Sequence, residues 1–562
     1  MKVSMLEQRT GDLDGTMPWW RGAVGYEIYV RSFADSSGDG LGDLAGITSR
    51  LDYLSWLGVD ALWLTPFYPS PGHDHGYDVS DYCAVSPRHG TLQDFDVLVS
   101  EAHRRRLRVM VDIVPNHTSI EHPWFARARS SPDGPERDRY LWADPAPDGG
   151  PPNNWRSHFG GPAWTLDEAS GQYWCHLFLP EQPDLNWRNP EVAGEFDSIL
   201  RWWMDRGVDG FRVDVAHGLV KDAELRDNPQ VAPLVADMDP FDAFYAFEHR
   251  YDLDQSENVE IFRRWNQVCA PRQAMLLGEV NAPWPERQSR YVEPGALDQA
   301  FFLQAAFLGW EPETLLTMVR AMHDAAPEGI SWVLSNHDRP RPVSRFGGGE
   351  AGVRRSLAVS TLFMALGGTP FLYQGEELAL SDGALRAGFH DPVSVRNEGA
   401  TSGRDGCRTP MPWDSSPNNG FSAGDPWIGA EPRRPEETVA GQQADADAPV
   451  HRYRDLLAVR RQHPDMWRAP LEWIDTPDRR VAALRRGTIA VVANLSDRRT
   501  DVNLASPGWE PVFVTQQGCR LDGAAHDAVS VPAETTVVLS SNYRQPPPTR
   551  RLPSSRSTWA GA

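Results

Sequence analysis

The stretch GFRVDVAH at residues 210–217 combines the pattern of a buried β-strand with two charged side chains. Side chains alternate along a strand, so Phe211, Val213 and Val215 would share one face while Arg212 and Asp214 share the other. In a barrel of parallel strands the apolar set packs against helices and the polar set points inward, with functional groups at the carboxyl ends. Because a neighbouring arginine lowers the pKa of a carboxylate, we expect Arg212 to hold Asp214 ionised. From this strand alone, a purely structural buried ion pair remains an alternative.

Short apolar runs alternate with amphipathic stretches from about residue 22 to residue 377. Helical patterns such as 44–58 and 190–207 separate most of these runs. Eight strands with intervening helices predict the α/β class, with a parallel (β/α)8 TIM barrel. The predicted strands are 25–33, 61–67, 107–117, 210–215, 274–280, 299–304, 330–338 and 369–377.

The irregular segments predict how the chain divides into domains. The connection after the third strand is rich in Pro, Gly, Trp and Arg and is too long for a simple loop. We therefore expect a catalytic barrel in two parts, 17–117 and 186–460, separated by an inserted domain B at 118–185. Alternating apolar residues predict a C-terminal antiparallel β-sandwich domain at 465–542. The tail at 543–562 has the composition of a disordered segment.

Composition excludes several kinds of function. The chain has 55 Lys and Arg against 77 Asp and Glu, a formal net charge of −22, which argues against a nucleic-acid partner. Lys2 and Lys221 are its only lysines, which disfavours Schiff-base chemistry. Five cysteines without a CxxC motif signal neither disulfides nor zinc. With no signal peptide and no apolar run near the ~20 residues of a membrane span, we expect a soluble cytoplasmic protein with no membrane partner; its oligomeric state is not predicted.

Polar side chains also follow three other predicted strands. The third strand ends in DIVPNH (112–117), the fifth in GEV (278–280) and the seventh in SNHD (335–338). One such group would be explained as a cap or a satisfied buried residue. Polar groups at four of eight strand ends instead indicate a site at the carboxyl end of the barrel.

These motifs resemble those of the α-amylase family of glycoside hydrolases, in particular its exo-acting α-glucosidase and oligo-1,6-glucosidase branch. DIVPNH, GFRVDVAH, GEV and SNHD look like its four signature regions, in the family's order. QPDLNW (182–187) is similar to a fifth, and RTPMPWD (408–414) resembles the segment RTPMQWD near the site. The similarity covers roughly residues 17 to 540.

The resemblance implies catalytic roles for three carboxyl groups. Asp214 matches the nucleophile that forms a covalent glucosyl–enzyme intermediate, and Arg212 matches the residue that positions it. Glu279 matches the general acid/base, and Asp338 the carboxylate that stabilises the distorted, oxocarbenium-like sugar. A retaining mechanism places the acid and the nucleophile about 5–5.5 Å apart, with one neutral and the other charged.

The resemblance also implies residues that bind the sugar. His117 and His337 match the histidines that bind hydroxyls of the glucose in the first subsite. In GHDHGYDVSDY (72–82), Tyr77 matches a tyrosine that stacks on the sugar and Asp74 an aspartate that binds its distal hydroxyls. Arg408 looks like the arginine that pairs with this aspartate and closes the pocket. A closed pocket implies trimming of short oligosaccharides or glucosides from the non-reducing end.

Linkage preference stays open at this stage. In related enzymes a valine after the nucleophile tends to accompany α-1,6 activity, and here that residue is Val215. The chain departs from the family at Arg339, where a glutamine or asparagine is commoner, and an arginine there could alter the acceptor subsite. We therefore expect α-1,4- or α-1,6-linked short α-glucosides as substrates.

The loop DSSGDGLGDL (35–44) resembles a calcium loop, although no glutamate stands at the twelfth position that an EF-hand requires. Similar loops in the family hold a structural Ca²⁺ or Mg²⁺, and the corresponding ligands would be Asp35, Ser37, Asp39, Leu41 and Asp43. The alternative is a glycine-rich turn held by Asx hydrogen bonds. The chemistry itself requires no cofactor.

Two other functions compete with hydrolysis. A transglucosidase or a disaccharide isomerase resembling trehalose synthase would use the same covalent intermediate with a sugar as acceptor. A non-catalytic amylase-like interaction protein is the more remote alternative, because such relatives lose catalytic carboxylates that this chain retains.

Overall fold

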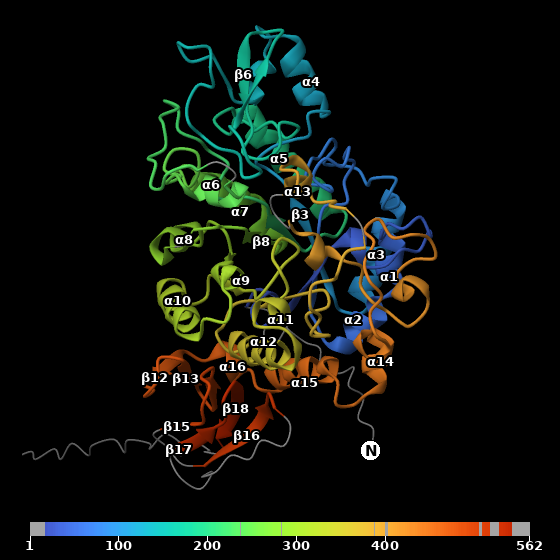
Figure 1. Ribbon diagram of the computed structural model, residues 1–562, viewed down its shortest axis with the longest axis vertical. Coiled ribbons are helices and arrows are strands. Elements are labelled where there is room, and N and C mark those ends of the chain that lie inside the picture. The colour runs from blue at the N-terminus through green and yellow to red at the C-terminus, as the bar shows by residue number, and fades with distance from the viewer. Residues whose placement is uncertain are drawn as a thin grey trace, which may run out of the picture.

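The computed structural model describes residues 17–541 apart from 236–237, 283, 387, 400–402, 505–507 and 517–527. The tail predicted to be disordered, 543–562, lies outside the described residues. A barrel occupies the middle of the molecule, with an inserted segment at one end and a C-terminal pair of sheets at the other (Figure 1).

Eight parallel strands form the barrel, in the order β10-β9-β8-β7-β3-β2-β1-β11. A parallel bridge between Val333 and Phe371 joins the two outermost strands and closes the ring. The predicted (β/α)8 barrel is thereby confirmed, and each strand is shorter than predicted because the polar ends lie in loops. The strands are β1 (Gly25–Ile28), β2 (Ala61–Leu64), β3 (Arg108–Ile113), β7 (Gly210–Val213), β8 (Met275–Gly278), β9 (Gln299–Phe302), β10 (Ile330–Trp332) and β11 (Phe371–Tyr373).

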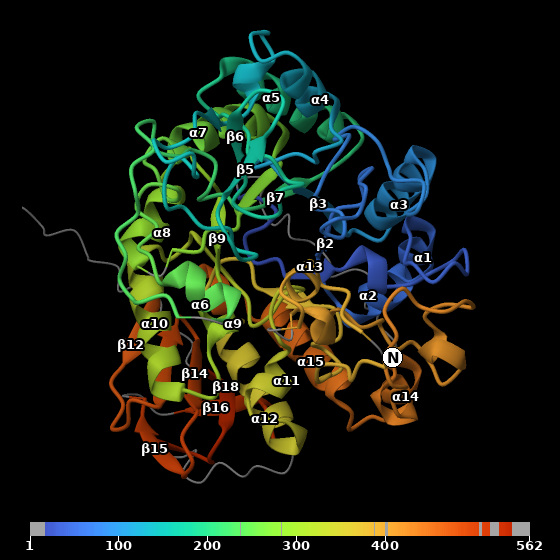
Figure 2. The same cartoon turned by 45° about the horizontal axis from the view of Figure 1, so that its top comes forward.

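Amphipathic helices surround these strands (Figure 2). The helix predicted at 44–58 is interrupted at Arg50, whose φ of −106° and ψ of 4° are not helical. The longer barrel helices bury their apolar faces; α5, for example, buries Phe196, Leu200 and Trp203. They are α1 (Leu44–Ser49), α2 (Leu51–Leu57), α3 (Leu92–Arg104), α5 (Pro190–Asp205), α7 (Asn258–Cys269), α8 (Pro285–Tyr291), α10 (Pro312–Ala325), α12 (Gly349–Phe363) and α15 (Pro449–Gln462). Shorter helices are α4 (Pro123–Ser130), α6 (Pro240–Tyr245), α9 (Gln304–Phe307), α11 (Pro342–Arg345), α13 (Pro392–Arg396), α14 (Val439–Ala444) and α16 (Asp465–Arg468).

The interior of the barrel has an apolar floor below a charged layer. Trp63, Met110, Leu277 and Phe301 belong to one buried cluster on the inward face. Two residues further along β3 and β8, the inward positions are Asp112 and Glu279, so alternation along a strand places charge above the floor. Charges on such a floor are shielded from water, which strengthens their mutual interactions.

The insertion after β3 carries its own three-stranded antiparallel sheet, in the order β4-β6-β5. Its strands are β4 (Trp142–Ala143), β5 (Trp164–Asp167) and β6 (Gln172–Cys175), and Trp155 and Tyr173 belong to its core. These strands lie within the predicted domain B, at the top of Figure 1. The domain boundaries themselves stay a prediction.

At the other end, a five-stranded antiparallel sheet with the order β12-β13-β14-β18-β16 accompanies the pair β15-β17. One buried cluster contains Val492 and Val537 of the larger sheet together with Val502 and Val529 of the pair. The two sheets therefore share a core, as a sandwich requires. The strands are β12 (Leu471–Ile474), β13 (Val481–Arg486), β14 (Ile489–Asn494), β15 (Thr500–Asn503), β16 (Trp509–Val514), β17 (Ala528–Val531) and β18 (Thr535–Ser541).

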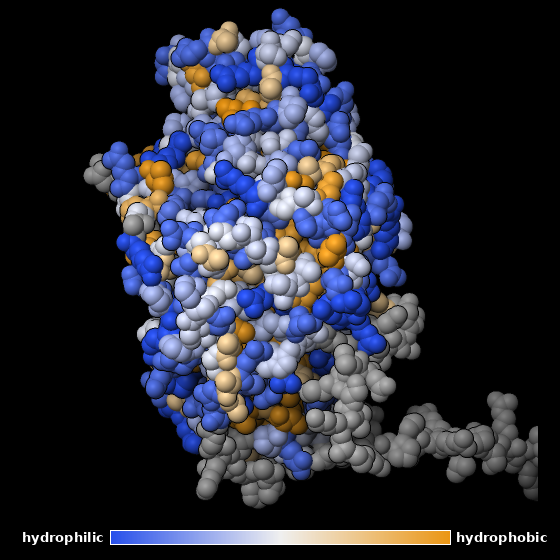
Figure 3. Space-filling view, turned by 90° about the vertical axis from the view of Figure 1, so that its right-hand side faces the viewer, coloured by the Kyte–Doolittle hydropathy of each residue, from blue (hydrophilic) through white to orange (hydrophobic). Residues whose placement is uncertain are grey.

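The face seen in Figure 3 is largely hydrophilic, with hydrophobic residues in small separate patches. Among the described residues, no helix has both the length and the apolarity that crossing a bilayer requires.

Candidate active site

Three carboxyl groups surround the guanidinium of Arg212, which is fully buried above the indole ring of Trp63. Its Nη1 donates to Asp112 Oδ1 at 2.9 Å and to Asp214 Oδ1 at 2.6 Å, and its Nη2 lies 2.8 Å from Glu279 Oε2. The strand register explains the first pair, because Asp112 lies opposite Arg212 on neighbouring β3 and β7. Arg212 thus fixes the positions of Asp214 and Glu279 relative to each other.

Backbone contacts connect the same two strand ends. Glu279 N donates to Val213 O at 2.9 Å, and Val215 N donates to Glu279 Oε2 at 3.0 Å. Val215 has a φ of 43°, a left-handed conformation that is costly for a β-branched residue. Strain of this kind persists only where the surrounding structure enforces it, and here it turns the amide of Val215 toward the carboxyl group.

The protonation of this cluster differs from the sequence-based expectation. Burial raises the pKa of Asp214 well above its ordinary value; Arg212 opposes this shift, whereas the negative charges of Glu279 and Asp112 add to it. Burial likewise raises the pKa of Asp112 to about 6 against the effect of Arg212. Arg212 therefore favours the ionised form of Asp214, as expected, but its effect on the pKa does not outweigh that of burial. Asp112 and Asp214 interact through Arg212, so a proton taken up here belongs to the pair and not to either residue.

Asp338, the third of the predicted catalytic carboxyl groups, lies apart from Arg212 in a different electrostatic setting. Its Oδ1 accepts from Arg404 Nη1 at 3.0 Å and from Arg408 Nη2 at 2.7 Å. Burial opposes ionisation of Asp338 and also keeps His337 neutral, so the two guanidinium groups are the charges that hold the pKa of Asp338 well below its usual range. Asp338 therefore ionises more readily than Asp112 and Asp214.

Asp74 closes the far end of the site with an arginine that the sequence analysis did not name. Arg404 Nη2 donates to Asp74 Oδ1 at 3.1 Å and to Asp391 Oδ1 at 2.8 Å. The predicted pairing of Asp74 with Arg408 was wrong, because Arg408 turns instead to Asp338 and to the carbonyl of His337. No motif pointed to Arg404, which lies four residues before RTPMPWD and reaches Asp74 across 330 positions of the chain.

A chain of hydrogen bonds orients Tyr77 beneath the pocket. His337 Nδ1 lies 2.5 Å from Glu27 Oε1, its Nε2 lies 2.8 Å from Tyr77 Oη, and Tyr77 donates to Asp112 Oδ2 at 2.9 Å. Burial raises the pKa of Glu27 well above its ordinary value, so we assign its proton to the bond with His337 Nδ1. The neutral His337 then donates from Nε2 to Tyr77, and every member has a partner.

The insertion supplies one wall of the site. His117 Nε2 lies 3.0 Å from Gln182 Nε2, and Gln182 Nε2 also lies 3.2 Å from Asp74 Oδ2. Burial lowers the pKa of His117 to about 4, so this imidazole is neutral at physiological pH. Phe159 and Phe178 of the insertion line the same pocket.

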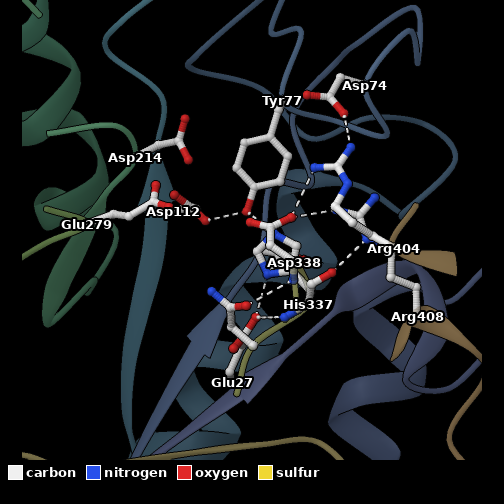
Figure 4. Close-up of polar contacts among 12 residues, drawn as sticks. Glu27, Asp74, Tyr77, Asp112, Asp214, Glu279, His337, Asp338, Arg404 and Arg408 are labelled. Carbon is white, nitrogen blue, oxygen red and sulfur yellow. Dashed lines mark hydrogen bonds and ion pairs between the residues drawn. The ribbon is translucent and has the colours of Figure 1, made fainter. Parts of the chain in front are cut away.

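The pocket has a volume of about 120 Å³ and is bordered by Asp74, Tyr77, His117, Asp214, Glu279 and Asp338. Figure 4 shows Asp214 and Glu279 on one side of Tyr77, with Asp74 and Arg404 on the other. Arg212, His337 and Arg408 do not line it; they lie behind the lining side chains and hold them through the contacts above. Besides Arg404, sequence reasoning missed the aromatic residues Phe159, Phe178, Phe241 and Phe307, for which it had no motif.

The candidate cation loop stabilises itself. Asp35 accepts from the amides of Ser37, Gly38 and Gly40 at 2.7–2.9 Å, and Asp43 accepts from Gly46 N at 2.6 Å as the cap of α1. Hydrogen bonds of this kind are the ones expected if the loop is a glycine-rich turn held by aspartate side chains. In the part of the chain that the structure describes, no group of three or more His, Cys, Asp or Glu side chains is placed to hold a metal ion. A structural Ca²⁺ or Mg²⁺ at Asp35, Ser37, Asp39, Leu41 and Asp43 stays a prediction.

A parallel barrel with three carboxyl groups around one pocket, two of them with pKa values shifted in opposite directions, is the arrangement of a barrel-fold glycoside hydrolase. The family described as Alpha amylase, catalytic domain, matches residues 27–469. A probable alpha-glucosidase of Rhizobium meliloti (strain 1021) is 41% identical over 526 residues, covering 91% of this chain and 95% of that protein. An oligo-1,6-glucosidase of Parageobacillus thermoglucosidasius is 38% identical over 482 residues, covering 79% of this chain and 84% of that protein. The crystal structure of an alpha-glucosyl transfer enzyme matches with a TM-score of 0.87 and 38% identity, covering 94% of this chain and 100% of that one.

The chain belongs to the α-amylase family of glycoside hydrolases. It is therefore an enzyme, and these similarities support hydrolysis of α-glucosides. The non-catalytic alternative is excluded.

Proposed function

We propose that this enzyme is a retaining, exo-acting α-glucosidase that releases α-glucose from the non-reducing end of short α-glucosides. The observation that carries the proposal is the pair Asp214 and Glu279 on a single guanidinium, in a pocket whose far end is closed by Asp74 and Arg404. Two carboxyl groups held by one rigid fork favour the short separation of retaining enzymes, about 5–5.5 Å, over the about 6.5–9.5 Å of inverting enzymes.

In the proposed mechanism, Asp214 attacks the anomeric carbon of the terminal glucose while Glu279 protonates the departing glycosidic oxygen. The proton that burial favours at Asp214 passes to Glu279 before the attack, which leaves Asp214 ionised as the nucleophile and Glu279 protonated as the acid. Glu279 then removes a proton from water, which attacks the glucosyl–Asp214 ester and releases glucose with its original α-configuration. Ionised Asp338 and the neutral His117 bind hydroxyls of the distorted sugar, and Arg212 stabilises the charge on Asp214.

The closed end supports exo-action. Asp74 and Arg404 form a wall beside Tyr77, so a chain could enter the pocket only by its terminal glucose. Small oligosaccharides or glucosides are thus the proposed substrates, and the choice between α-1,4 and α-1,6 linkages is left to experiment. No cofactor takes part in any step. A cytoplasmic location stays a prediction.

A second candidate is transfer of the glucosyl group to another sugar, as in a transglucosidase or a trehalose synthase-like isomerase. The similarity to an alpha-glucosyl transfer enzyme over 94% of the chain favours keeping it. Both reactions share the glucosyl–Asp214 intermediate and differ only in whether water or a hydroxyl group reaches it first.

A proton-NMR time course with maltose, isomaltose and trehalose in parallel tests both candidates, with Asp214→Ala as the inactive control. Hydrolysis with retention releases the transferred glucose as its α-anomer, so early free glucose holds more α-anomer than the mutarotated mixture. A new disaccharide with little free glucose would favour transfer, and an early excess of β-glucose would contradict the retaining mechanism.

A further inference from the structure

Arg339 extends beside Asp338 into the open side of the pocket. Its guanidinium carbon lies 3.7 Å from the centre of the Phe307 ring and 5.6 Å from that of Phe241. Tyr245, another lining residue, is 47% exposed and Phe307 is 41% exposed, whereas Asp74 at the closed end is 4% exposed. Arg339 therefore faces the side where the group attached to the terminal glucose, the aglycone, would leave the pocket.

The guanidinium group of Arg339 is not bound directly by any acid within the described residues. Its half-buried side chain makes no hydrogen bond and no ion pair there, in contrast to Arg404, which contacts Asp74, Asp338 and Asp391. Burial lowers the pKa of Arg339, and the nearby Tyr245, Asp338 and Glu279 oppose this shift without cancelling it. A cation held against aromatic faces with its N–H edge unsatisfied is a typical anion-binding arrangement.

We propose that Arg339 binds an oxyanion, a carboxylate or a phosphate, carried by the aglycone of the α-glucoside. This inference rests on the proposed function and narrows its substrate class. The stacked face of the guanidinium is covered by Phe307, which leaves the edge that forms paired N–H bonds to two oxygen atoms. Neutral aglycones would contact the same aromatic residues but would form no charge-assisted bonds with this edge.

Matched aryl glucosides separate charge from size. The 4-carboxyphenyl and 4-carbamoylphenyl α-glucosides differ by one charge at nearly equal volume, and the 4-phosphonophenyl α-glucoside tests the phosphate-like arm. For each protein the measured quantity is the ratio of kcat/KM for a charged substrate to that for the carbamoyl substrate. The leaving-group reactivity of each aglycone is the same for every variant. A difference in this ratio between two variants therefore comes from the protein and not from the substrates.

Arg339→Gln should lower the charged-to-neutral ratio by about tenfold or more, mainly through KM, because it removes a charge-assisted hydrogen-bond pair. Arg339→Lys should restore part of the ratio. Arg320→Gln is the matched control: Arg320 on α10 also stacks on an aromatic ring, Trp473, at 4.7 Å, and it does not line the pocket. A ratio that falls for only one charged substrate identifies whether the carboxylate or the phosphate-like group is bound.

An unchanged ratio in Arg339→Gln would overturn the inference while leaving the proposed function intact. A variant that gains on the neutral substrate without losing on the charged ones would instead assign Arg339 to neutral aglycones. If the wild type cleaves none of the three, the proposed function fails for aryl glucosides. In that case, calorimetry measures the affinities of the charged and carbamoyl glucosides for Asp214→Ala proteins with and without Arg339→Gln. The ratio of charged to neutral affinity then tests the inference.

Discussion

The two ends of the pocket hold similar numbers of acids but different numbers of arginines. At the catalytic end, Asp112, Asp214 and Glu279 share Arg212. At the closed end, Asp74, Asp338 and Asp391 are held by Arg404, and Asp338 also by Arg408. Charge balance, and not burial alone, thus decides which carboxyl groups stay ionised, since members of both groups are buried. The catalytic end favours the protonation that an acid catalyst needs; at the closed end Asp338 and Asp391 stay ionised, whereas burial raises the pKa of Asp74 despite its arginines.

Removing the nucleophile should have the largest effect. Asp214→Ala deletes the group that forms the covalent intermediate, and we expect kcat to fall on the order of 10⁴-fold or more. The measurement is kcat on the best substrate of the NMR assay, with circular dichroism to establish folding. A folded variant that keeps more than about one hundredth of the activity would contradict the role given to Asp214.

Breaking the closed end should cost less. Arg404→Gln removes the cation shared by three carboxyl groups, and a loss in kcat/KM of about 10²-fold or more is expected. Arg408→Gln is the comparison, because it takes one arginine from Asp338 but leaves the Asp74–Arg404 pair in place. Its loss should be smaller. Equal losses would mean that the Asp74–Arg404 contact has no separate role in substrate binding.

The shared proton makes the catalytic end sensitive to pH. Raising the pH removes this proton, so kcat/KM should fall on the alkaline side, while ionised Asp338 contributes no limb there. Asp112→Asn removes one negative charge from the cluster, which lowers the pKa of the remaining acids. The alkaline limb should therefore move to lower pH by about one unit. A pH profile of kcat/KM checks this, and a limb that stays in place or moves upward would refute the shared-proton description.

The smallest predicted effect concerns an acid outside the pocket. It tests how burial alters the pKa of a carboxyl group that forms no ion pair with an arginine. Glu376 is buried, accepts from Ser360 Oγ at 3.0 Å and makes no ion pair in the described part of the chain; burial raises its pKa to about 7. Its folded-state pKa exceeds the unfolded value, so stability falls as pH rises from about 4.5 through about 7. Glu376→Gln should abolish this fall.

Urea unfolding at two pH values measures the Glu376 effect. Near pH 8 we expect Glu376→Gln to be more stable than the wild type by about 1–3 kcal/mol, and near pH 5 the difference should be small. If the variant is equally destabilised at both pH values, lost packing rather than ionisation governs this position.

The sequence predicted much of the fold because the relevant signals are local. Short apolar runs marked all eight barrel strands, and the polar groups after four of them marked the end of the barrel that carries the site. Arg212 and Asp214 could be placed on one face from their spacing alone. The interruption at Arg50 was missed, since an apolar pattern continues across a break in helical geometry.

By itself, the sequence determined the barrel, the identity of the carboxyl groups and the acidic character of the chain. Only the tertiary structure decided which arginine meets which acid. Arg404 rather than Arg408 reaches Asp74 across 330 positions, and His337 meets Glu27 across 310. The same packing buried Asp214 beside two other acids and so raised its pKa despite the neighbouring Arg212. Strand periodicity is set by neighbours in the chain, whereas a buried charge depends on every group that folding brings around it.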